Sequence, residues 1–371
     1  MKIRITTIFE AINYGGLLQA YALQEKIKEL FPDDDVKIIN YRPCFTEKDL
    51  KIVRTRIGNG YKKILHALMD LTFYKTRKSK IMFFQNFVRD RLCLTEPIAD
   101  DTISNLDTNF DILISGSDQI WNPKITDGVP NRVYYGALNG KFKRISYASS
   151  MGEYILNDEN ADEILSNLCR YNHLAVRESF LAKRLENVLN RNVTSVLDPT
   201  LLLSNKEWDD KLALPSNRLD KKYIFVFSAA PYRVAKKLCV IAKQISNYTG
   251  MEIIVLGMEF KVKGTKLLRT ASPEQFVDLI RNAEIVVTDS FHGTVFSVNY
   301  NKNFLSVTDT IRSERQIDFL QKIGLMDYYI DNPDVPIKSN QWVVNYSEAN
   351  ERLNDLKRSS MTYLEKAIKE S

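Results

Sequence analysis

Short apolar runs alternate with amphipathic segments of helical length along this chain, and the alternation predicts βαβ units with mostly parallel sheets. In the first half, the apolar runs predict strands at residues 2–8, 36–41, 111–115, 144–149, 174–177 and 195–197. In the second half, they predict strands at residues 223–228, 252–256, 266–268, 285–288 and 304–307. The pattern therefore predicts an α/β protein with two sets of strands.

A polar, turn-rich segment at residues 214–222 separates the two sets and predicts an interdomain linker. Because 371 residues exceed one ordinary core, we assign an N-terminal domain to residues 1–213 and a C-terminal domain to residues 222–346. The tail, residues 347–371, predicts an amphipathic helix whose apolar side carries Leu353, Leu356, Leu364 and Ile368.

Composition indicates the setting of the protein. No run of about 20 apolar residues predicts a transmembrane helix. Glu10 and Asn13 interrupt the apolar core that a signal peptide needs. The four cysteines are far apart and show neither paired metal spacing nor a disulfide framework. We expect a cytoplasmic protein with reduced thiols and no bound metal.

One segment, about residues 46–95, departs from the α/β alternation because it is basic and rich in aromatic residues. Its basic residues include Lys51, Arg54, Arg56, Lys62, Lys63, Lys75, Arg77, Lys78, Lys80 and Arg89. One interpretation is a helix lying on the anionic inner face of the membrane, near a lipid-linked acceptor. The other is a solvated helical insertion that covers the sheet. The whole chain carries a net charge of only +6 and no recognition motif, so we expect no nucleic acid partner.

The segment at residues 285–294 predicts a buried strand that ends in a polar turn before a helix. The turn contains Asp289, Ser290, His292, Gly293 and Thr294. In open α/β sheets ligands bind beyond the carboxyl ends of strands, and a helix start favours an anion. His292 is therefore a candidate general acid or base. The alternative is a histidine that only caps its own turn, and Asp289 either orients His292 or caps the turn.

Two further strands end in polar turns of the same kind. The turn after residues 110–115 contains Ser117, Asp118, Gln119, Trp121 and Asn122, a composition typical of a carbohydrate site with an indole platform. The alternative is a capped turn with Trp121 in the core. Near the start of the chain, Asn13, Tyr14, Gly15 and Gly16 form a loop before an amphipathic helix, and paired glycines allow close approach of a ligand. Three polar turns on one side of parallel strands predict a shared cleft.

Together these segments resemble the polysaccharide pyruvyl transferase family. The resemblance covers most of the chain and rests on six motifs: N-Y-G-G with L-Q-A-Y-A-L at 13–23, G-S-D-Q-I-W-N at 116–122, K-R-I-S-Y-A-S-S at 143–150, A-V-R-E at 175–178, V-L-D-P-T at 196–200 and T-D-S-F-H-G-T at 288–294. The family resemblance implies a GT-B-like architecture, with two Rossmann-like domains, a cleft between them, and a last helix packed on the N-terminal domain.

The resemblance also implies an activity: transfer of a pyruvyl group from phosphoenolpyruvate, the co-substrate, to a sugar as a ketal during surface or capsular polysaccharide biosynthesis. No other cofactor is implied. Galactose-type sugars are common acceptors in the family, so a 4,6-ketal on galactose is the first expectation. The acceptor is expected on a lipid diphosphate, a nucleotide or a polymer, with the N-terminal domain on the acceptor side and the C-terminal domain on the donor side.

Site roles follow from the same resemblance. His292 matches the family's histidine and is the expected general acid, and Asp118 is expected to bind acceptor hydroxyls and to serve as the base. The expected acceptor-binding residues are Asn13, Tyr14, Gly15, Gly16, Ser117, Gln119, Trp121 and Asn122. Many family members carry Arg-Leu before the histidine, where this chain has Ser290 and Phe291. The expected donor-binding residues are Arg177, Ser290, Gly293 and Thr294. Because they follow the predicted strand at 304–307, Arg312 and Arg315 are expected to supply the missing charge. The alternative is that both are surface arginines paired with Glu314 or Asp318.

Two other functions are consistent with the same features. A GT-B-type glycosyltransferase would bind a nucleotide sugar in the second domain, although no extended Gly-rich diphosphate loop occurs there. A non-catalytic sugar-binding or assembly factor would keep the cleft and lose the chemistry, and the presence of His292 argues against it.

Overall fold

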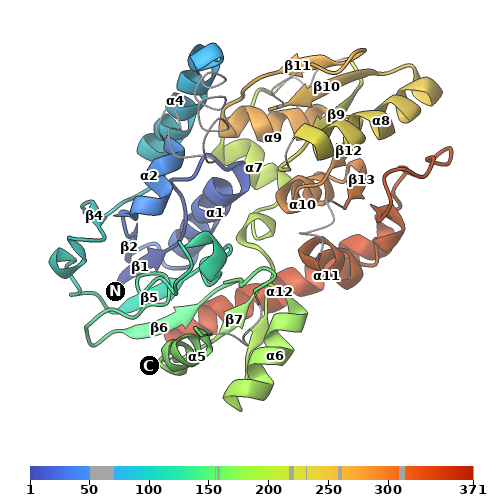
Figure 1. Ribbon diagram of the computed structural model, residues 1–371. Helices are drawn as coiled ribbons and strands as arrows, with labels where there is room; N and C mark the ends of the chain where they lie inside the picture. Colours follow the sequence, from blue (N-terminus) through green and yellow to red (C-terminus); the bar gives the residue numbers. More distant parts are fainter. Residues whose placement is uncertain are drawn as a thin grey trace. The chain divides into compact units, whose positions relative to one another are not determined.

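The computed structural model describes residues 1–50, 71–154, 156, 159–216, 221–230, 232–257, 261–308 and 314–370. The chain forms two compact units: unit 1 is Met1–Leu202 with Leu356–Ser371, and unit 2 is Leu203–Asp355. Each unit contains a parallel sheet with helices beside it (Figure 1), so the prediction of two α/β domains is confirmed. Among the described helices, none is both long and apolar enough to span a bilayer.

The main sheet of unit 1 has four parallel strands in the order β2 (Asp35–Ile38), β1 (Lys2–Thr6), β5 (Ile112–Ser115) and β6 (Lys143–Ser146). Two isolated bridges, Ile145 to His173 and Ser149 to Val176, continue it from β6 to the parallel pair β7 (Ala175–Val176) and β8 (Thr194–Ser195). A second short pair joins β3 (Tyr41–Arg42) and β4 (Ile98–Ala99). Because β1, β5, β6, β7 and β8 run in one direction, the turns that follow them lie at the same edge of the sheet.

Unit 1 also contains helices, the most buried of which is α1 (Tyr14–Leu30). The others are α2 (Cys44–Leu50), α4 (Tyr74–Arg91), α5 (Ala161–Cys169) and α6 (Ser179–Leu189), with the short 3-10 turns η1 (Ile103–Asn105), η2 (Pro123–Ile125) and η3 (Pro199–Leu201). Of the predicted basic segment, only the part from residue 71 onward and residues 46–50 are described. Lys51, Arg54, Arg56, Lys62 and Lys63 lie outside the described residues.

The last helix, α12 (Ser347–Lys369), begins in unit 2 and ends in unit 1. In unit 1, the Tyr363 hydroxyl donates to the backbone oxygen of Ser146 at 3.0 Å, and the Ser360 hydroxyl accepts from the amide of Leu197 at 2.9 Å. The Lys143 ammonium donates to the carbonyls of Ala367, Ile368 and Glu370 at the helix end. A cation at a helix C-terminus satisfies carbonyls that lack partners within the helix.

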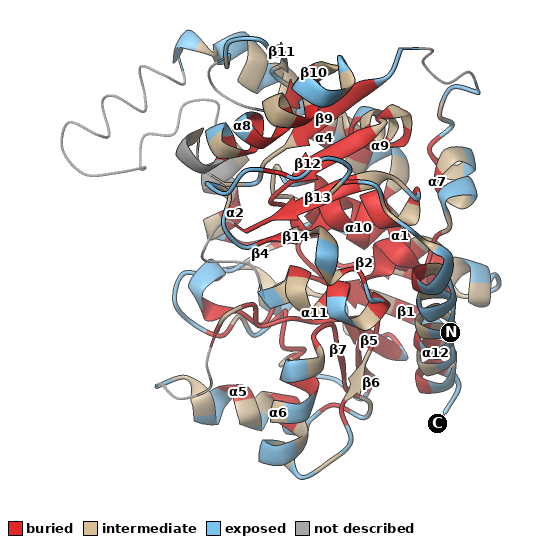
Figure 2. Cartoon of the chain, turned by 90° about the vertical axis from the view of Figure 1, so that its right-hand side faces the viewer, coloured by how far each residue is buried: buried red, intermediate tan, exposed pale blue. Residues whose placement is uncertain are grey.

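The sheet of unit 2 has six parallel strands in the order β11 (Lys266–Leu268), β10 (Glu252–Leu256), β9 (Tyr223–Phe227), β12 (Ile285–Thr288), β13 (Asn303–Val307) and β14 (Tyr329–Ile330). Its helices are α7 (Asn205–Lys211), α8 (Tyr232–Thr249), α9 (Pro273–Asn282), α10 (Phe291–Asn299) and α11 (Glu314–Ile323), followed by η4 (Met326–Tyr328). Strands β9, β12 and β13 and helix α10 are largely buried (Figure 2), as expected for a parallel sheet covered on both faces.

The two units divide between Leu202 and Leu203, before α7, whereas the sequence predicts the division after that helix, at residues 214–222. Contacts of Asp209, on α7, explain the difference. Its carboxylate accepts from the Tyr300 hydroxyl at 2.8 Å and pairs with Arg281 at 3.2 Å. These bonds attach α7 to unit 2, and residues 217–220 of the predicted linker lie outside the described part of the chain.

Candidate active site

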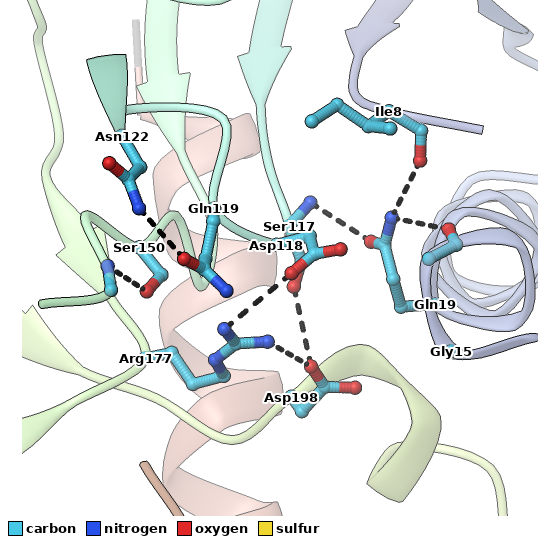
Figure 3. Close-up of polar contacts among 12 residues, drawn as sticks. Ile8, Gly15, Gln19, Ser117, Asp118, Gln119, Asn122, Ser150, Arg177 and Asp198 are labelled. Atoms are coloured by element: carbon cyan, nitrogen blue, oxygen red, sulfur yellow. Dashed lines mark hydrogen bonds and ion pairs between the residues drawn. The ribbon is translucent and has the colours of Figure 1, made fainter. Parts of the chain in front are cut away.

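The loop after β1 and the turn after β5 meet at the sheet edge of unit 1. The Asn13 side chain caps α1 by accepting from the amides of Gly15 at 3.0 Å and Gly16 at 3.3 Å. One turn along the helix, the Gln19 amide group donates to the Gly16 carbonyl at 2.8 Å and accepts from the Ser117 amide at 3.1 Å (Figure 3). The two turns that the sequence predicted separately are therefore linked through Gln19.

The backbone of the β5 turn places Asp118 at this edge. Gly116 has φ +135°, and a Cβ there would lie 1.9 Å from the Tyr147 carbonyl oxygen, so only glycine fits. The Asp118 carbonyl accepts from the Ser150 amide at 2.9 Å, which fixes the turn against the segment after β6. The Asp118 side chain is 12% exposed, and its Oδ2 would lie 3.4 Å from a Cβ placed on Gly16. Asp118 therefore faces the start of α1.

Arg177, directly after β7, is surrounded by three carboxylates. Its Nη1 donates to Asp198 at 2.9 Å, and its Nη2 lies 3.7 Å from Asp118 Oδ1 (Figure 3). Its Nε donates to Glu178 at 3.1 Å. Burial alone lowers the pKa of this guanidinium, but the charges of Glu178, Asp198 and Asp118 outweigh it, and the pKa is raised above its ordinary value. The side chain is 4% exposed, so these pairs are desolvated.

Hydrogen bonds extend this carboxylate cluster, defined as Asp118, Arg177, Glu178 and Asp198. Glu178 accepts from the Ser150 hydroxyl at 2.8 Å, and Asp198 accepts from the amide and the hydroxyl of Thr200 at 3.0 and 2.7 Å. The cluster joins the ends of three parallel strands, β5, β7 and β8, and carries more negative than positive charge. Asp118 is the most exposed carboxylate of the cluster, at 12%, while Glu178 and Asp198 are fully buried. No group of three or more His, Cys, Asp or Glu in the described residues is arranged to hold a metal ion.

Trp121 does not form the predicted sugar platform, and that prediction is wrong. The side chain is 0% exposed, and its indole nitrogen donates to the Tyr134 carbonyl at 3.1 Å. The indole stacks on Tyr135, with centroids 5.7 Å apart, and contacts the edge of Tyr171 at 5.6 Å. The burial of a large aromatic surface and the satisfied N–H group make Trp121 a core residue, which was the alternative interpretation of this turn.

The other predicted acceptor residues differ in accessibility. Tyr14 is buried against Phe84, with ring centroids 5.0 Å apart, so it packs within the unit instead of facing a ligand. Ser117 is also fully buried. Asn122 caps η2 through the Lys124 amide and donates to Gln119 Oε1 at 2.9 Å. Gln119 is partly exposed, and its contact with an acceptor stays a prediction.

In unit 2, His292 occupies the second position of α10, at the carboxyl end of β12. The Ser290 hydroxyl caps the helix by accepting from the Gly293 amide at 3.3 Å. Asp289 accepts from the hydroxyl of Ser228 and from the amide of Ala229 at 2.8 Å, so it caps the turn that follows β9. His292 is 6% exposed, and the predicted strand, turn and helix are confirmed around it.

The predicted donor residues of unit 2 fall into two groups. Thr294 is fully buried, with its hydroxyl 3.2 Å from the Ser290 carbonyl and 2.9 Å from Ser306 Oγ. The buried hydroxyl therefore stabilises the turn from within, and a donor contact for Thr294 stays a prediction. The Arg315 guanidinium lies 5.7 Å from the centroid of the Phe291 ring, which in turn contacts the His292 ring edge-on at 5.1 Å. Arg312 lies outside the described residues.

Replacing Gly293 with Ala is expected to lower the free energy of unfolding by about 1–3 kcal/mol, because it overpacks the turn below His292. A Cβ there would lie 2.4 Å from Thr288 Oγ1, and that hydroxyl is fixed by bonds to Phe227 and Ser290. Urea unfolding measures the loss. Gly16→Ala is the matched control, since its nearest neighbour would lie at 3.4 Å and the cost should stay below about 1 kcal/mol. Equal stability of the two variants would contradict the prediction.

Three residues that build this edge had no predicted role: Gln19, Glu178 and Asp198. Glu178 follows Arg177 directly, and Asp198 precedes Pro199 at a strand end, a position typical of capping residues. Gln19 had no such signal, since a glutamine inside an amphipathic helix usually faces solvent. Its burial follows from the near-complete burial of the first turns of α1.

Comparisons with known proteins give one family and several structural similarities. A family model described as polysaccharide pyruvyl transferase matches residues 13–309. No protein of curated function matches the chain in sequence. UDP-GlcNAc 2-epimerase from Methanocaldococcus jannaschii is 12% identical, with a TM-score of 0.49 over 96% of this chain and 100% of its own. The glycosyltransferase SnogD from Streptomyces nogalater is 11% identical, with a TM-score of 0.43 over 100% of this chain and 98% of its own.

Proposed function

Because this chain belongs to the polysaccharide pyruvyl transferase family, we propose that it transfers a pyruvyl group from phosphoenolpyruvate to two hydroxyls of one sugar, forming a ketal in surface polysaccharide biosynthesis. The observation that carries the proposal is His292 in its capped turn at the carboxyl end of β12, in contact with the Phe291 ring, whose centroid lies 5.7 Å from the Arg315 guanidinium. The matched residues include both His292 and Asp118.

The reaction sets three chemical requirements. One sugar hydroxyl adds to C2 of phosphoenolpyruvate while the methylene carbon C3 takes up a proton. A second hydroxyl of the same sugar then bonds to C2, phosphate leaves with the C–O bond electrons, and both hydroxyl protons must be accepted. The enzyme therefore needs a general acid near C3, a base near the hydroxyls and positive charge near the phosphate.

His292 is the proposed acid that protonates C3. Imidazole is the side chain whose ordinary pKa best suits proton transfer near neutral pH. The start of α10 adds the positive end of a helix dipole, which favours the carboxylate and phosphate of the donor. The Ser290 cap and the contact with Phe291 hold the histidine at this helix start.

Arg315 is the proposed cation for the donor, in place of the arginine that many family members carry where this chain has Ser290. Its guanidinium lies over the Phe291 ring. Phe291 precedes His292 in the sequence and contacts its ring. A guanidinium binds carboxylate and phosphate oxygens through paired N–H groups. A donor contact for Arg177 stays a prediction, since that side chain already pairs with three carboxylates.

Asp118 and Gln119 are the proposed acceptor contacts in unit 1. Asp118 is the partly exposed carboxylate of the carboxylate cluster, and it would accept the protons of the attacking hydroxyls. The excess of negative charge around it suits neutral hydroxyls better than a phosphorylated donor. A galactose-type sugar bridged at its 4 and 6 hydroxyls is the first acceptor to test.

Thermal unfolding with phosphoenolpyruvate tests the donor assignment. A ligand present at 100 times its dissociation constant adds about 2.7 kcal/mol to the free energy of unfolding. Arg315→Gln should weaken binding about ten- to hundredfold, as expected for lost charge-assisted bonds. Arg352→Gln, which removes an exposed ion pair with Glu348 in the same unit, should leave binding unchanged. No stabilisation by millimolar phosphoenolpyruvate would refute the donor, and stabilisation by nucleotide sugars alone would favour a glycosyltransferase.

A further inference from the structure

Helix α4 is anchored to the start of α1 by aromatic contacts. Phe84 packs on Tyr14 with centroids 5.0 Å apart, and Phe87 packs edge-on against Tyr21 at 5.5 Å. The Lys80 ammonium lies 5.6 Å from the centroid of the Tyr14 ring. Tyr14 lies in the predicted acceptor loop, Asn13–Gly16, whose Gly16 faces Asp118, so α4 lies directly beside that loop.

The opposite face of α4 is basic and carries large apolar side chains. Tyr74 is 41% exposed and Met82 is 47% exposed. Lys75 and Lys78 are exposed between them, and they fall on the same side of the helix because these positions recur at intervals of three and four residues. Exposed Arg89 continues this side toward the end of the helix. We call Tyr74, Lys75, Lys78, Met82 and Arg89 the outer face of α4.

Charge complementarity identifies the partner of the outer face. Helix α4 carries six basic side chains and one acidic side chain, Asp90, while the whole chain has a net charge of only +6. An anionic bilayer matches this surface, because apolar side chains insert below the headgroups while ammonium groups contact lipid phosphates. The exposed Tyr74 and Met82 side chains therefore favour a bilayer over a partner that is bound through charge alone.

We propose that the outer face of α4 binds the surface of an anionic lipid bilayer. The bound protein then presents its acceptor loop, through the contacts of Tyr14 with α4, to a sugar carried on a lipid at that surface. This second step rests on the proposed function, whereas binding to the bilayer does not. Each lysine near an anionic surface contributes about fivefold to binding.

Vesicle sedimentation tests the proposal with the full chain. Binding to vesicles of phosphatidylcholine with 30% phosphatidylglycerol should exceed binding to phosphatidylcholine alone and should weaken as salt is raised. Lys75→Gln with Lys78→Gln should reduce binding about 25-fold. Tyr74→Ser with Met82→Ser should also reduce it, without changing its dependence on salt. Equal binding of the native chain to both kinds of vesicle would overturn the proposal.

A matched control separates a specific face from general charge. Lys183→Gln with Arg184→Gln removes the same charge from α6, a helix of unit 1 that also exposes apolar side chains, Phe180 and Val188. Full bilayer binding by this α6 variant supports the proposal that the outer face of α4 is the binding surface. An equal loss of binding in the α6 variant and in Lys75→Gln with Lys78→Gln overturns that proposal. Turnover of a soluble sugar should be unchanged in the α4 variants, so failure of the proposed chemistry and failure of bilayer binding are distinguishable.

Discussion

Replacing His292 with Gln is expected to lower kcat for pyruvyl transfer by about 10²–10⁴-fold, the usual contribution of a positioned general acid. The amide of Gln has no titratable proton to give to the methylene carbon, although it fills similar space. His292 sits at the start of α10, which the Ser290 cap holds independently, so the turn should persist. Release of phosphate from phosphoenolpyruvate in the presence of the sugar measures the loss, and stabilisation by phosphoenolpyruvate should remain within about threefold in affinity.

The matched control for this loss is His173→Gln. His173 lies in unit 1 before β7, 3.9 Å from Glu370, and has no part in the proposed chemistry. Its replacement should leave kcat within twofold of the native value. Native turnover in His292→Gln would remove this residue from the mechanism, while retained binding with lost turnover separates catalysis from donor recognition.

Replacing Arg177 with Met is expected to lower the free energy of unfolding by about 3–5 kcal/mol, the cost of leaving buried charge without its partner. The substitution keeps much of the side-chain volume but removes the cation shared by Asp118, Glu178 and Asp198. Urea unfolding, followed by tyrosine and tryptophan fluorescence, measures the change. Arg177→Lys should lower the free energy of unfolding by less than Arg177→Met, because its ammonium keeps the positive charge. It should still be less stable than the native chain, because an ammonium cannot make the three separate contacts of the guanidinium.

Two comparisons show whether the charge cluster causes this loss. Asp198→Asn should be less harmful in the Arg177→Met background than alone, since it removes one of the uncompensated charges. Arg352→Met breaks an exposed pair with Glu348 and should cost at most about 1 kcal/mol. A loss in Arg177→Met as small as that of Arg352→Met would contradict the account of the cluster.

The strands of unit 2 were predictable because local pattern and final environment agree there. The runs at 252–256, 266–268 and 285–288 match β10, β11 and β12 residue for residue. β10 and β12 lie inside the sheet, so their apolar runs are continuous. The two-residue strand β14 escaped prediction, since so short an element has no period to read.

Strand direction made it possible to predict which turns lie together at the site, but not which of their side chains face a ligand. The rule that polar turns gather at the carboxyl ends of parallel strands correctly brought Asn13–Gly16 and Asp118 together in unit 1. The same rule says nothing about which side chains of a turn face inward. The sugar-platform prediction for Trp121 failed for that reason, because its stacking partner, Tyr135, comes from another element.

Because α12 begins in unit 2 and ends in unit 1, it sets an order for folding during synthesis. Unit 1 needs Ser360 and Tyr363 to satisfy the backbone at Leu197 and Ser146, but the ribosome makes these residues only after all of unit 2. That surface of the nascent unit 1 sheet therefore stays uncovered while some 150 intervening residues emerge, roughly 8–30 s at usual elongation rates. Unit 2 can mature first, and the domain that begins the chain is the last to be completed.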